Sequence, residues 1–355
     1  MNALIRKANS LYKVISSNIS IRKEYKNEVT TRINNNQIAI LNTSLGTSNL
    51  GDEIIMFYIK RNISEYLQGY DIIEVSTHLY PTKEQVEKLL DSKYVLIYGT
   101  NILSPRMELY SGWKFDERLI HLHNVILIGT GWWGYQHTSA YSKYVYKRIL
   151  STECLQSVRD EQTCQKLRKI GISNVVNTNC LTMWGLDKKC DNIPTFKCDT
   201  VVFTITSVLR QAEADKKLIE ILLKNYTRLF FWPQADTDME YLVEIMGDGM
   251  RNINVIERSL SAYTAFLRKT QVDYVGSRLH GGIHALQNGR RTIIIAVDNR
   301  ATEIKKDTNL PVIAVEDVKI LLEDMINSEW KTDIHLNTEN INHWMGSFSA
   351  TLRGE

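Results

Sequence analysis

The sequence predicts an α/β protein built from two doubly wound, Rossmann-like domains that face each other across a cleft. Its 355 residues exceed one ordinary domain, and from residue 37 onward short apolar runs alternate with longer helical patterns. The polar, proline-containing segment 188–198 interrupts this alternation and is the expected linker. Hydrophobic residues make up 43% of the chain and charged residues 23%, which are ordinary globular values. A disordered or collagen-like chain is therefore excluded.

The first series of elements lies between residues 37 and 187. Continuous apolar strands such as Val125–Ile128 indicate burial on both faces, as in a parallel sheet. Strands are expected at Gln37–Asn42, Asp71–Val75, Tyr94–Tyr98, Val125–Ile128, Ser157–Val158 and Val175–Val176. Helices are expected between them at Asp52–Tyr66, Thr82–Leu90, Ser139–Ile149 and Glu161–Ile170.

A second series follows the linker. Strands are expected at Val201–Thr206, Leu229–Trp232, Tyr274–Gly276 and Thr292–Ala296. Helices are expected at Ala212–Asn225, Met239–Met246, Ser261–Thr270, Gly281–Asn288 and Val315–Ile326. Two such series predict a GT-B-like architecture with ligands at the carboxyl ends of the strands. The expected parts are a basic N-terminal extension (1–36), an N-terminal acceptor domain (37–187), the linker, a C-terminal donor domain (199–330) and a segment packing back on the N-terminal domain (331–355).

Charge and cysteine content narrow the function classes. A formal net charge of +3 is too small to favour nucleic acid as a partner. Five cysteines without a CxxC pair favour reduced thiols in the cytoplasm and argue against a zinc site. The extension 1–36 is rich in Lys and Arg, so peripheral contact with the inner face of a membrane is one interpretation and a solvated extension is the other.

The segment 274–284 carries the strongest signal for chemistry. A strand ends at Gly276, and a Gly pair at 281–282 opens a helix. Between them stand a hydroxyl, a guanidinium and an imidazole, from Ser277, Arg278 and His280. Together with the free amides of a helix N-terminus, these groups predict an anion-binding site with a proton donor beside it. His284, one turn later, either flanks His280 or packs inside.

Two further segments place polar residues at the start of a helix. Asn49, Gly51 and Asp52 follow the first strand, and Asp52 is either a helix N-cap or a carboxylate that handles a sugar hydroxyl. Arg159 follows the strand at 157–158 and suits phosphate or carboxylate, although an ion pair with a neighbouring carboxylate is the alternative.

Three other candidates stand near strand ends. Trp132 and Trp133 lie in a Gly-rich loop, where core packing explains at least one ring and stacking on a sugar could explain the other. Arg300 should reach the same rim as Arg278, unless it is a surface residue on a turn. His121 and His123 are interpreted as structural, and no metal site is expected.

In this order, the segments Asn-x-Gly-Asp, Ser-Val-Arg-Asp, Ser-Arg-Leu-His and a strand ending near Asp-x-Arg resemble the polysaccharide pyruvyl transferase family. The resemblance implies transfer of a pyruvyl group from phosphoenolpyruvate, as co-substrate and without a cofactor, to two hydroxyls of a sugar. It implies Asp52 as the acceptor-side carboxylate, Arg159 and Arg278 as donor-binding residues, and His280 as general acid. Ser277, Leu279, Gly281 and Arg300 complete the expected donor site, and Asn49, Gly51, Trp132 and Trp133 the acceptor site.

The expected acceptor is a cell-surface polysaccharide or its lipid-linked oligosaccharide precursor. Arg300 stands where the family commonly has Lys, and Gly289-Arg290-Arg291 replaces its usual Gly-x-Pro. Two alternatives remain at this point. One is a GT-B glycosyltransferase that uses a sugar nucleotide, and the other is a non-catalytic glycan-binding protein with the same fold.

Overall fold

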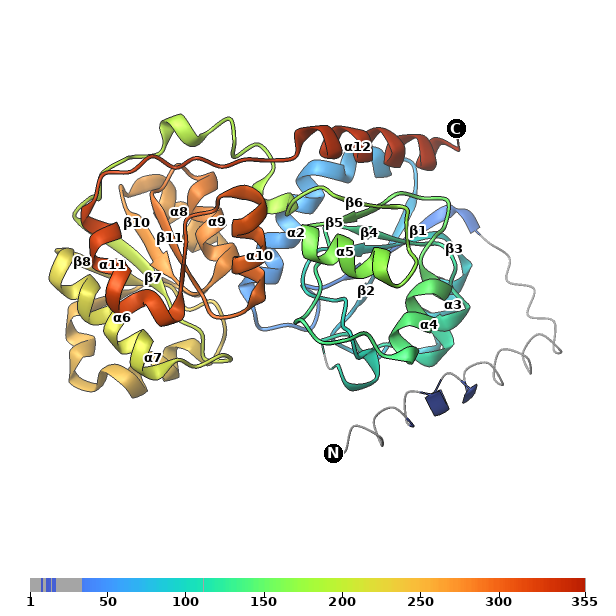
Figure 1. Ribbon diagram of the computed structural model, residues 1–355, viewed down its shortest axis with the longest axis horizontal. Coiled ribbons are helices and arrows are strands. Elements are labelled where there is room, and N and C mark those ends of the chain that lie inside the picture. Colours follow the sequence, from blue (N-terminus) through green and yellow to red (C-terminus); the bar gives the residue numbers. More distant parts are fainter. Residues whose placement is uncertain (1–7, 9–10, 14, 17–33, 111, 355) are drawn as a thin grey trace. The chain divides into compact units, whose positions relative to one another are not determined.

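The structure is a computed structural model that describes residues 34–110 and 112–354, together with residues 8, 11–13 and 15–16. Most of the predicted basic extension therefore lies outside the described residues. The chain divides into two compact units (Figure 1). Unit 1 comprises residues 1–47, 59–181 and 337–355, and unit 2 comprises residues 48–58 and 182–336.

Unit 1 is built on parallel strands. β1 to β4 form a sheet in the order β2-β1-β3-β4, and β5 pairs in parallel with β6. The strands are β1 (Asn34–Asn42), β2 (Asp71–Ser76), β3 (Ser92–Tyr98), β4 (Val125–Ile128), β5 (Gln156–Val158) and β6 (Val175–Asn177). The helices are α3 (Lys83–Asp91), α4 (Ala140–Ile149), α5 (Glu161–Lys169) and α12 (Thr338–Arg353). As predicted, β4 is buried along its whole length.

Unit 2 contains a six-stranded parallel sheet in the order β12-β11-β10-β7-β8-β9. Its strands are β7 (Thr200–Thr204), β8 (Arg228–Phe231), β9 (Ile253–Val255), β10 (Asp273–Gly276), β11 (Thr292–Ala296) and β12 (Val312–Ala314). Its helices are α6 (Ala212–Asn225), α7 (Asp238–Met246), α8 (Leu260–Lys269), α9 (Leu279–Gln287), α10 (Asn299–Thr308) and α11 (Val318–Asn327). Numbered within the unit, this is the strand order 3-2-1-4-5-6 of a dinucleotide-binding fold.

Helices cover both faces of the unit 2 sheet. Helices α6, α7 and α11 lie on one face, and α8, α9 and α10 lie on the other (Figure 1). This follows from right-handed crossovers, because the strand order reverses direction between β7 and β10. The predicted class, α/β with two parallel sheets, is thus confirmed.

The division of the chain differs from the expected domain bounds at several places, and residues 182–187 and the expected linker 188–198 lie within unit 2. Helix α2 (Leu50–Ile63) begins in unit 2, because the amide of Leu50 donates to the carbonyl of Gln234 at 2.9 Å. The expected C-terminal segment 331–355 divides at residue 337: residues 337–355 lie in unit 1, where the indole of Trp344 donates to the carbonyl of Leu155 at 3.0 Å, and residues 331–336 lie in unit 2. Contacts far apart in sequence decide both assignments.

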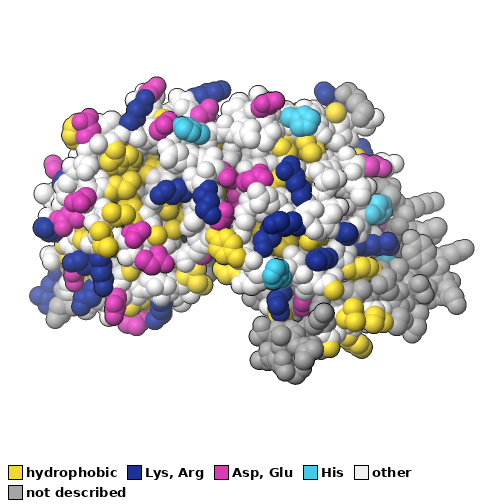
Figure 2. Space-filling model, viewed as in Figure 1, with side chains coloured by type: hydrophobic (Ala, Val, Ile, Leu, Met, Phe, Trp, Pro, Cys, Tyr) yellow, Lys and Arg dark blue, Asp and Glu magenta, His cyan; other side chains and the backbone are white. Residues whose placement is uncertain are grey.

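Four elements were not expected from the sequence. Strands β9 and β12 are three residues long and give too short an apolar run. Helix α10 is polar, with Ala301 and Ile304 as its buried apolar residues beside buried Glu303 and Thr308, and α12 contains Gly346. On the face shown in Figure 2, Lys and Arg side chains are intermixed with Asp and Glu side chains.

Candidate active site

The reversal of strand order in unit 2 lies between β7 and β10, and ligands of such sheets bind at the carboxyl ends of the strands there. Gly276 ends β10 directly against Thr204, the last residue of β7. A Cβ at Gly276 would lie 2.4 Å from the Thr204 carbonyl oxygen, so only glycine lets the two strands approach this closely. Ser277 and Arg278 follow immediately, and the Ser277 amide donates to the same carbonyl at 3.0 Å.

Arg278 occupies the N-cap position of α9, and no side chain caps that end of the helix. Its guanidinium forms a bidentate ion pair with Asp238, donating through Nε at 3.1 Å and through Nη2. The Asp238 carboxylate is fully buried, and the Arg278 side chain is 9% exposed. The pair fixes the Nε–Nη2 edge of the guanidinium, and the Nη1 end lies outside it.

Asp238 is held by several donors besides Arg278. Its Oδ1 accepts from the amide and hydroxyl of Ser207, and its Oδ2 accepts from the amides of Gln234 and Ala235. A buried carboxylate with this many charge-assisted bonds has one orientation. Asp238 therefore sets the position of Arg278, and sequence analysis missed it because an acidic residue at the start of a helix is commonplace.

His280 lies in the first turn of α9, which begins at Leu279, two residues before the predicted start at Gly281. It is 4% exposed. The two glycines that follow have no room for a side chain. A Cβ at Gly281 would lie 2.9 Å from Gln234 Oε1, and one at Gly282 would lie 2.7 Å from Ile294 Cγ1. The helix can therefore pack closely on β10 and β11, which positions its first turn at the end of β10.

Residues 48–52, which include the first residues of α2, belong to the same unit as α9. Asn49 Oδ1 accepts from the amide of Gly51 at 3.2 Å and from Gln234 Nε2 at 2.9 Å. Asn49 Nδ2 donates to Asp52 Oδ2 at 3.3 Å. Asn49, rather than Asp52, thus caps α2, which removes the N-cap interpretation of Asp52. The Asp52 carboxylate is buried and is oriented by the Asn49 amide.

Three buried polar atoms in this region have no hydrogen-bond partner. They are Ser277 Oγ, Gln234 Oε1 and Trp232 Nε1. Gln234 Oε1 and the Trp232 ring both face the first turn of α9, since each lies close to where a Gly281 Cβ would be. Buried groups are nearly always paired, so unpaired ones beside a helix N-terminus make this site a candidate for a polar ligand.

His284 packs inside unit 2. Thr264 Oγ1 donates to the Leu260 carbonyl at 2.7 Å, so it accepts from His284 Nε2 at 2.9 Å. His284 Nδ1 then accepts from the Tyr58 hydroxyl at 2.9 Å. Burial lowers the pKa of His284 to about 4, with a smaller contribution from Arg268. The neutral imidazole is a structural group, which decides between the two interpretations of this residue.

This lowered pKa predicts a loss of stability in acid. The unfolded imidazole takes up a proton near pH 6.5 and the folded one only near 4, so protonation favours the unfolded chain as pH falls through this interval. As the pH falls from about 7 to about 4.5, we expect protonation of His284 to lower the free energy of unfolding by about 2 to 3 kcal/mol. The measurement compares unfolding free energies of the unmodified protein and His284→Gln at both pH values. Equal acid sensitivity of the two would contradict the assignment.

Arg300 lies near the start of α10 and forms an ion pair with Asp298, the N-cap residue of that helix. Its Nη2 is 2.7 Å from Asp298 Oδ2, and its side chain is 28% exposed. The predicted surface turn is thus the first turn of a helix. Arg300 is a partly exposed guanidinium with a local carboxylate partner.

In unit 1, Arg159 lies at the end of β5 and is 1% exposed. Its Nε donates to Asp160 Oδ2 at 3.2 Å and its Nη2 donates to Asn101 Oδ1, whereas its Nη1 has no partner. The expected neighbouring carboxylate, Asp160, is therefore present, yet the Nη1 end of the Arg159 guanidinium has no hydrogen-bond partner. A Cβ at Gly131 would lie 2.3 Å from Arg159 Cζ, so this glycine makes room for the guanidinium.

Asn101 follows β3, and its Nδ2 is also buried without a partner. The preceding residue, Thr100, has a φ of +50°, which a β-branched side chain rarely adopts. The Thr100 carbonyl accepts from the Gly131 amide at 2.7 Å, which holds the strained turn in place. Asn101 and Arg159 thus present two unsatisfied donors at the carboxyl ends of the strands of unit 1.

The two tryptophans of the Gly-rich loop have different surroundings. Trp132 is fully buried in the core of unit 1, with its ring 5.6 Å from that of Tyr146. Its assignment to acceptor binding is therefore corrected, because neither ring face is open to a sugar. Trp133 is partly exposed, and its ring is 6.3 Å from that of Tyr110. It remains an acceptor candidate.

The structure sorts the predicted residues by unit. Unit 2 holds the residues of the α9 motif, of segment 48–52 and of α10, namely Asn49, Gly51, Asp52, Ser277, Arg278, Leu279, His280, Gly281 and Arg300. Trp132, Trp133 and Arg159 belong to unit 1. Sequence analysis missed Gln234 and Asp238, which connect the loop at Asn49 to the motif at Arg278. The polar run after a buried strand, Gln234 to Asp238, was the available signal.

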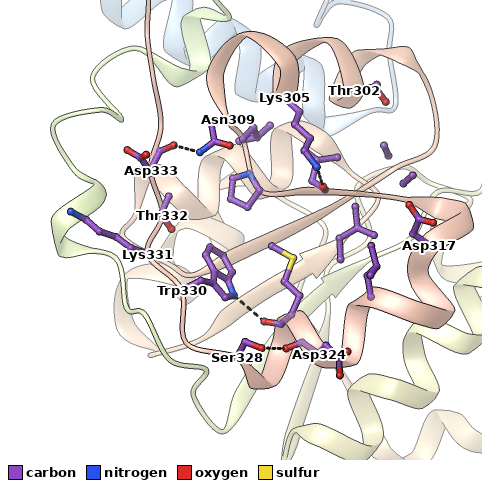
Figure 3. A pocket seen from close by; sticks show the side chains of 18 residues that line it. Thr302, Lys305, Asn309, Asp317, Asp324, Ser328, Trp330, Lys331, Thr332 and Asp333 are labelled. Atoms are coloured by element: carbon purple, nitrogen blue, oxygen red, sulfur yellow. Dashed lines mark hydrogen bonds between the residues drawn. The ribbon is translucent and has the colours of Figure 1, made fainter.

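A separate hollow of about 610 Å³ runs along edge strand β12 (Figure 3). It is lined mainly by apolar groups together with Trp330 and Lys305, whose ammonium donates to the Val312 carbonyl at 2.7 Å. It contains none of the predicted site residues. Within the described part of the chain, no helix is long and apolar enough to span a membrane, and no group of His, Cys, Asp and Glu gathers to hold a metal ion.

Solved structures share this fold. Staphylococcus aureus MnaA with UDP matches with a TM-score of 0.53 and 12% identity, over 87% of this chain and 90% of that one. Methanocaldococcus jannaschii UDP-GlcNAc 2-epimerase with UDP-GlcNAc and UDP matches with a TM-score of 0.50 and 11% identity, over 89% and 98%. Another UDP-N-acetylglucosamine 2-epimerase matches with a TM-score of 0.50 and 9% identity, over 90% of this chain and 96% of that one. The chain thus has a GT-B-like α/β fold.

The sequence identifies the family within that fold. The family model described as polysaccharide pyruvyl transferase matches residues 49–299, which include both the loop at Asn49 and the α9 motif. The chain belongs to the polysaccharide pyruvyl transferase family, which is a family of enzymes. No curated protein matches it.

Proposed function

We propose that the protein transfers a pyruvyl group from phosphoenolpyruvate to two hydroxyls of one sugar. The acceptor is a cell-surface polysaccharide or its lipid-linked precursor, and the reaction takes place in the cytoplasm or at the inner face of the membrane. The observation that supports this most is the pair Arg278–Asp238 at the end of β10, with His280 in the first turn of the adjoining helix. A fixed guanidinium beside an imidazole suits an anionic substrate that must be protonated.

In this proposal His280 donates a proton to the methylene carbon of phosphoenolpyruvate, which makes the neighbouring carbon electrophilic. One sugar hydroxyl adds to that carbon, and Asp52 removes its proton. The second hydroxyl then adds to the same carbon as the C–O bond to phosphate breaks. Of the two hydroxyl protons, one replaces the proton given by His280 and the other leaves with phosphate. The products are a cyclic ketal and inorganic phosphate.

The remaining residues have binding roles in this proposal. Arg278 holds an anionic group of phosphoenolpyruvate, with Ser277 and the amides of Leu279 and Gly281 beside it. The buried Oγ of Ser277 supports its role as a ligand-binding hydroxyl. Arg300, in the first turn of α10 after β11, supplies a second positive charge for the donor, and Asn49 and Gly51 shape the start of α2 that presents Asp52. In unit 1, we assign Arg159 to an anionic group of the substrates and Trp133 to the acceptor.

The test is direct product analysis. Purified protein is incubated with phosphoenolpyruvate and with glycan from cells that lack this protein. We expect one pyruvyl ketal on the glycan and release of one phosphate for each ketal. Nucleotide sugars form the second arm, because the same fold also occurs in proteins solved with UDP. If nucleotide sugars alone raise the melting temperature and no ketal forms, the glycosyltransferase alternative replaces this proposal.

A further inference from the structure

Unit 1 contains a second hollow, of about 290 Å³, that no predicted site residue lines. Aromatic rings form much of its wall, from Tyr80, Tyr110, Trp113, Phe115 and Tyr141. Three carboxylates, from Glu108, Asp116 and Glu117, stand among them. Rings and carboxylates together are the groups that recognise cations and sugars rather than phosphates.

The walls of this pocket are fixed by packing within unit 1. Trp113 is 4% exposed, and its ring meets that of Phe115 edge to face at 5.1 Å. Tyr141 is buried on α4. The Tyr110 hydroxyl donates to the carbonyl of Asn101. Because these side chains are already held, ligand binding would lose little conformational entropy in ordering the site.

Three carboxylates line the pocket together with the ammonium of Lys13, and Lys114 lies over the Tyr80 ring at 5.8 Å. Asp116 is balanced by Arg118, which donates to it at 2.9 Å and 2.7 Å. Glu108 accepts from the hydroxyl of Ser139 at 2.9 Å, a contact that leaves its charge in place. Burial raises the pKa of the Tyr141 hydroxyl, and the charges of Glu117 and Glu108 raise it further. The carboxylates of Glu108 and Glu117 favour a cation beside the Tyr141 ring.

An ammonium group already lies in the pocket. Lys13 Nζ is 3.7 Å from Glu117 Oε1 and 5.3 Å from the centroid of the Tyr141 ring. A carboxylate on one side and a ring face on the other form a cation–π site. The contact is partly exposed, because the side chains of Lys13 and Glu117 are 39% and 58% accessible. A ligand with the same group can therefore replace Lys13.

We propose that this pocket binds the ammonium group of a hexosamine unit in the acceptor glycan, and that Lys13 competes with the glycan for it. The saccharide part rests on the proposed function. Tyr110 connects the pocket to Trp133, the remaining acceptor candidate, through their ring contact at 6.3 Å. The same residue contacts Asn101, the partner of Arg159. The acceptor class is thus a glycan with a free amino group, which N-acetylation would exclude.

The test uses glucosamine, N-acetylglucosamine and glucose as probes, with binding followed by ligand-observed NMR in the absence of phosphoenolpyruvate. We expect glucosamine to bind at least about tenfold more tightly than the two neutral sugars, as one lost charge-assisted contact implies. Lys13→Ala should tighten glucosamine binding several-fold, and Glu117→Gln should weaken it about tenfold. Lys217→Ala and Glu220→Gln are matched controls, since that exposed pair at 3.4 Å lies on helix α6 of unit 2, and both should change nothing.

Two results would overturn the inference. Equal binding of glucosamine and N-acetylglucosamine would show that the ammonium group is not recognised. Unchanged glucosamine binding in Lys13→Ala would remove the competition. Because these measurements contain no donor, they are independent of the proposed reaction. Selective glucosamine binding without ketal formation would contradict the proposed function and still support the ammonium site.

Discussion

Replacing His280 with alanine is expected to lower turnover by about 10²- to 10⁴-fold, the usual contribution of a positioned general acid. Phosphoenolpyruvate binding should change little, because Arg278 and its partner Asp238 remain in place. The physical reason is that the methylene carbon must gain a proton before a hydroxyl can attack, and no other side chain of the first turn of α9 can supply it. Single-turnover rates with phosphoenolpyruvate and acceptor measure the loss, and calorimetry measures donor binding.

His284→Gln is the matched control for this experiment. His284 lies one turn later in the same buried helix, and its imidazole is engaged with Thr264 and Tyr58. Glutamine can accept from one and donate to the other, so the folded variant should keep most of its turnover at neutral pH. If His284→Gln is as inactive as His280→Ala, the loss of turnover comes from disruption of the helix and not from removal of the general acid. Loss of donor binding in His280→Ala would contradict the separation of roles.

The sequence predicted much of the fold because periodicity is a local property. Apolar runs such as Thr292–Ala296 and the alternation of strands with helices appear directly in the chain. Strand order could not be obtained this way, because the pairing of β10 with β7 joins residues some seventy positions apart. Short elements such as β9 also escaped, because three residues carry no measurable period.

The candidate site was predicted in part for the same reason. Ser277, Arg278 and His280 stand together in the chain, so their chemistry was visible. The residues that orient them were not visible, because Asp238 and Gln234 reach the motif only through the folded sheet. The burial of individual side chains could not be predicted from the sequence either. Adjacent tryptophans have the same chemistry in sequence, and only packing places Trp132 in the core and leaves Trp133 partly exposed.

The buried pair Arg278–Asp238 predicts the largest loss of stability. Asp238→Ala removes the acceptor for two side chains and three backbone amides, and it leaves the Arg278 charge uncompensated at 9% exposure. Breaking a buried pair from one side costs about 3 to 5 kcal/mol. We expect a correspondingly lower melting temperature and loss of donor binding, because the guanidinium is no longer held. Arg278→Ala should weaken phosphoenolpyruvate binding by about 10- to 100-fold, as expected for a lost charged contact.

Arg300 and Asp298 provide the matched comparison for this pair. They form the same kind of ion pair in the same unit, but Arg300 is 28% exposed. Exposed pairs contribute about 1 kcal/mol or less, so Arg300→Ala should leave the melting temperature nearly unchanged. A double-mutant cycle on Arg278 and Asp238 then separates stability from binding. A coupling energy for unfolding no larger than that of Arg300 and Asp298 would mean that Asp238 does not position Arg278. A large coupling together with unchanged donor binding in Arg278→Ala would instead make the pair purely structural.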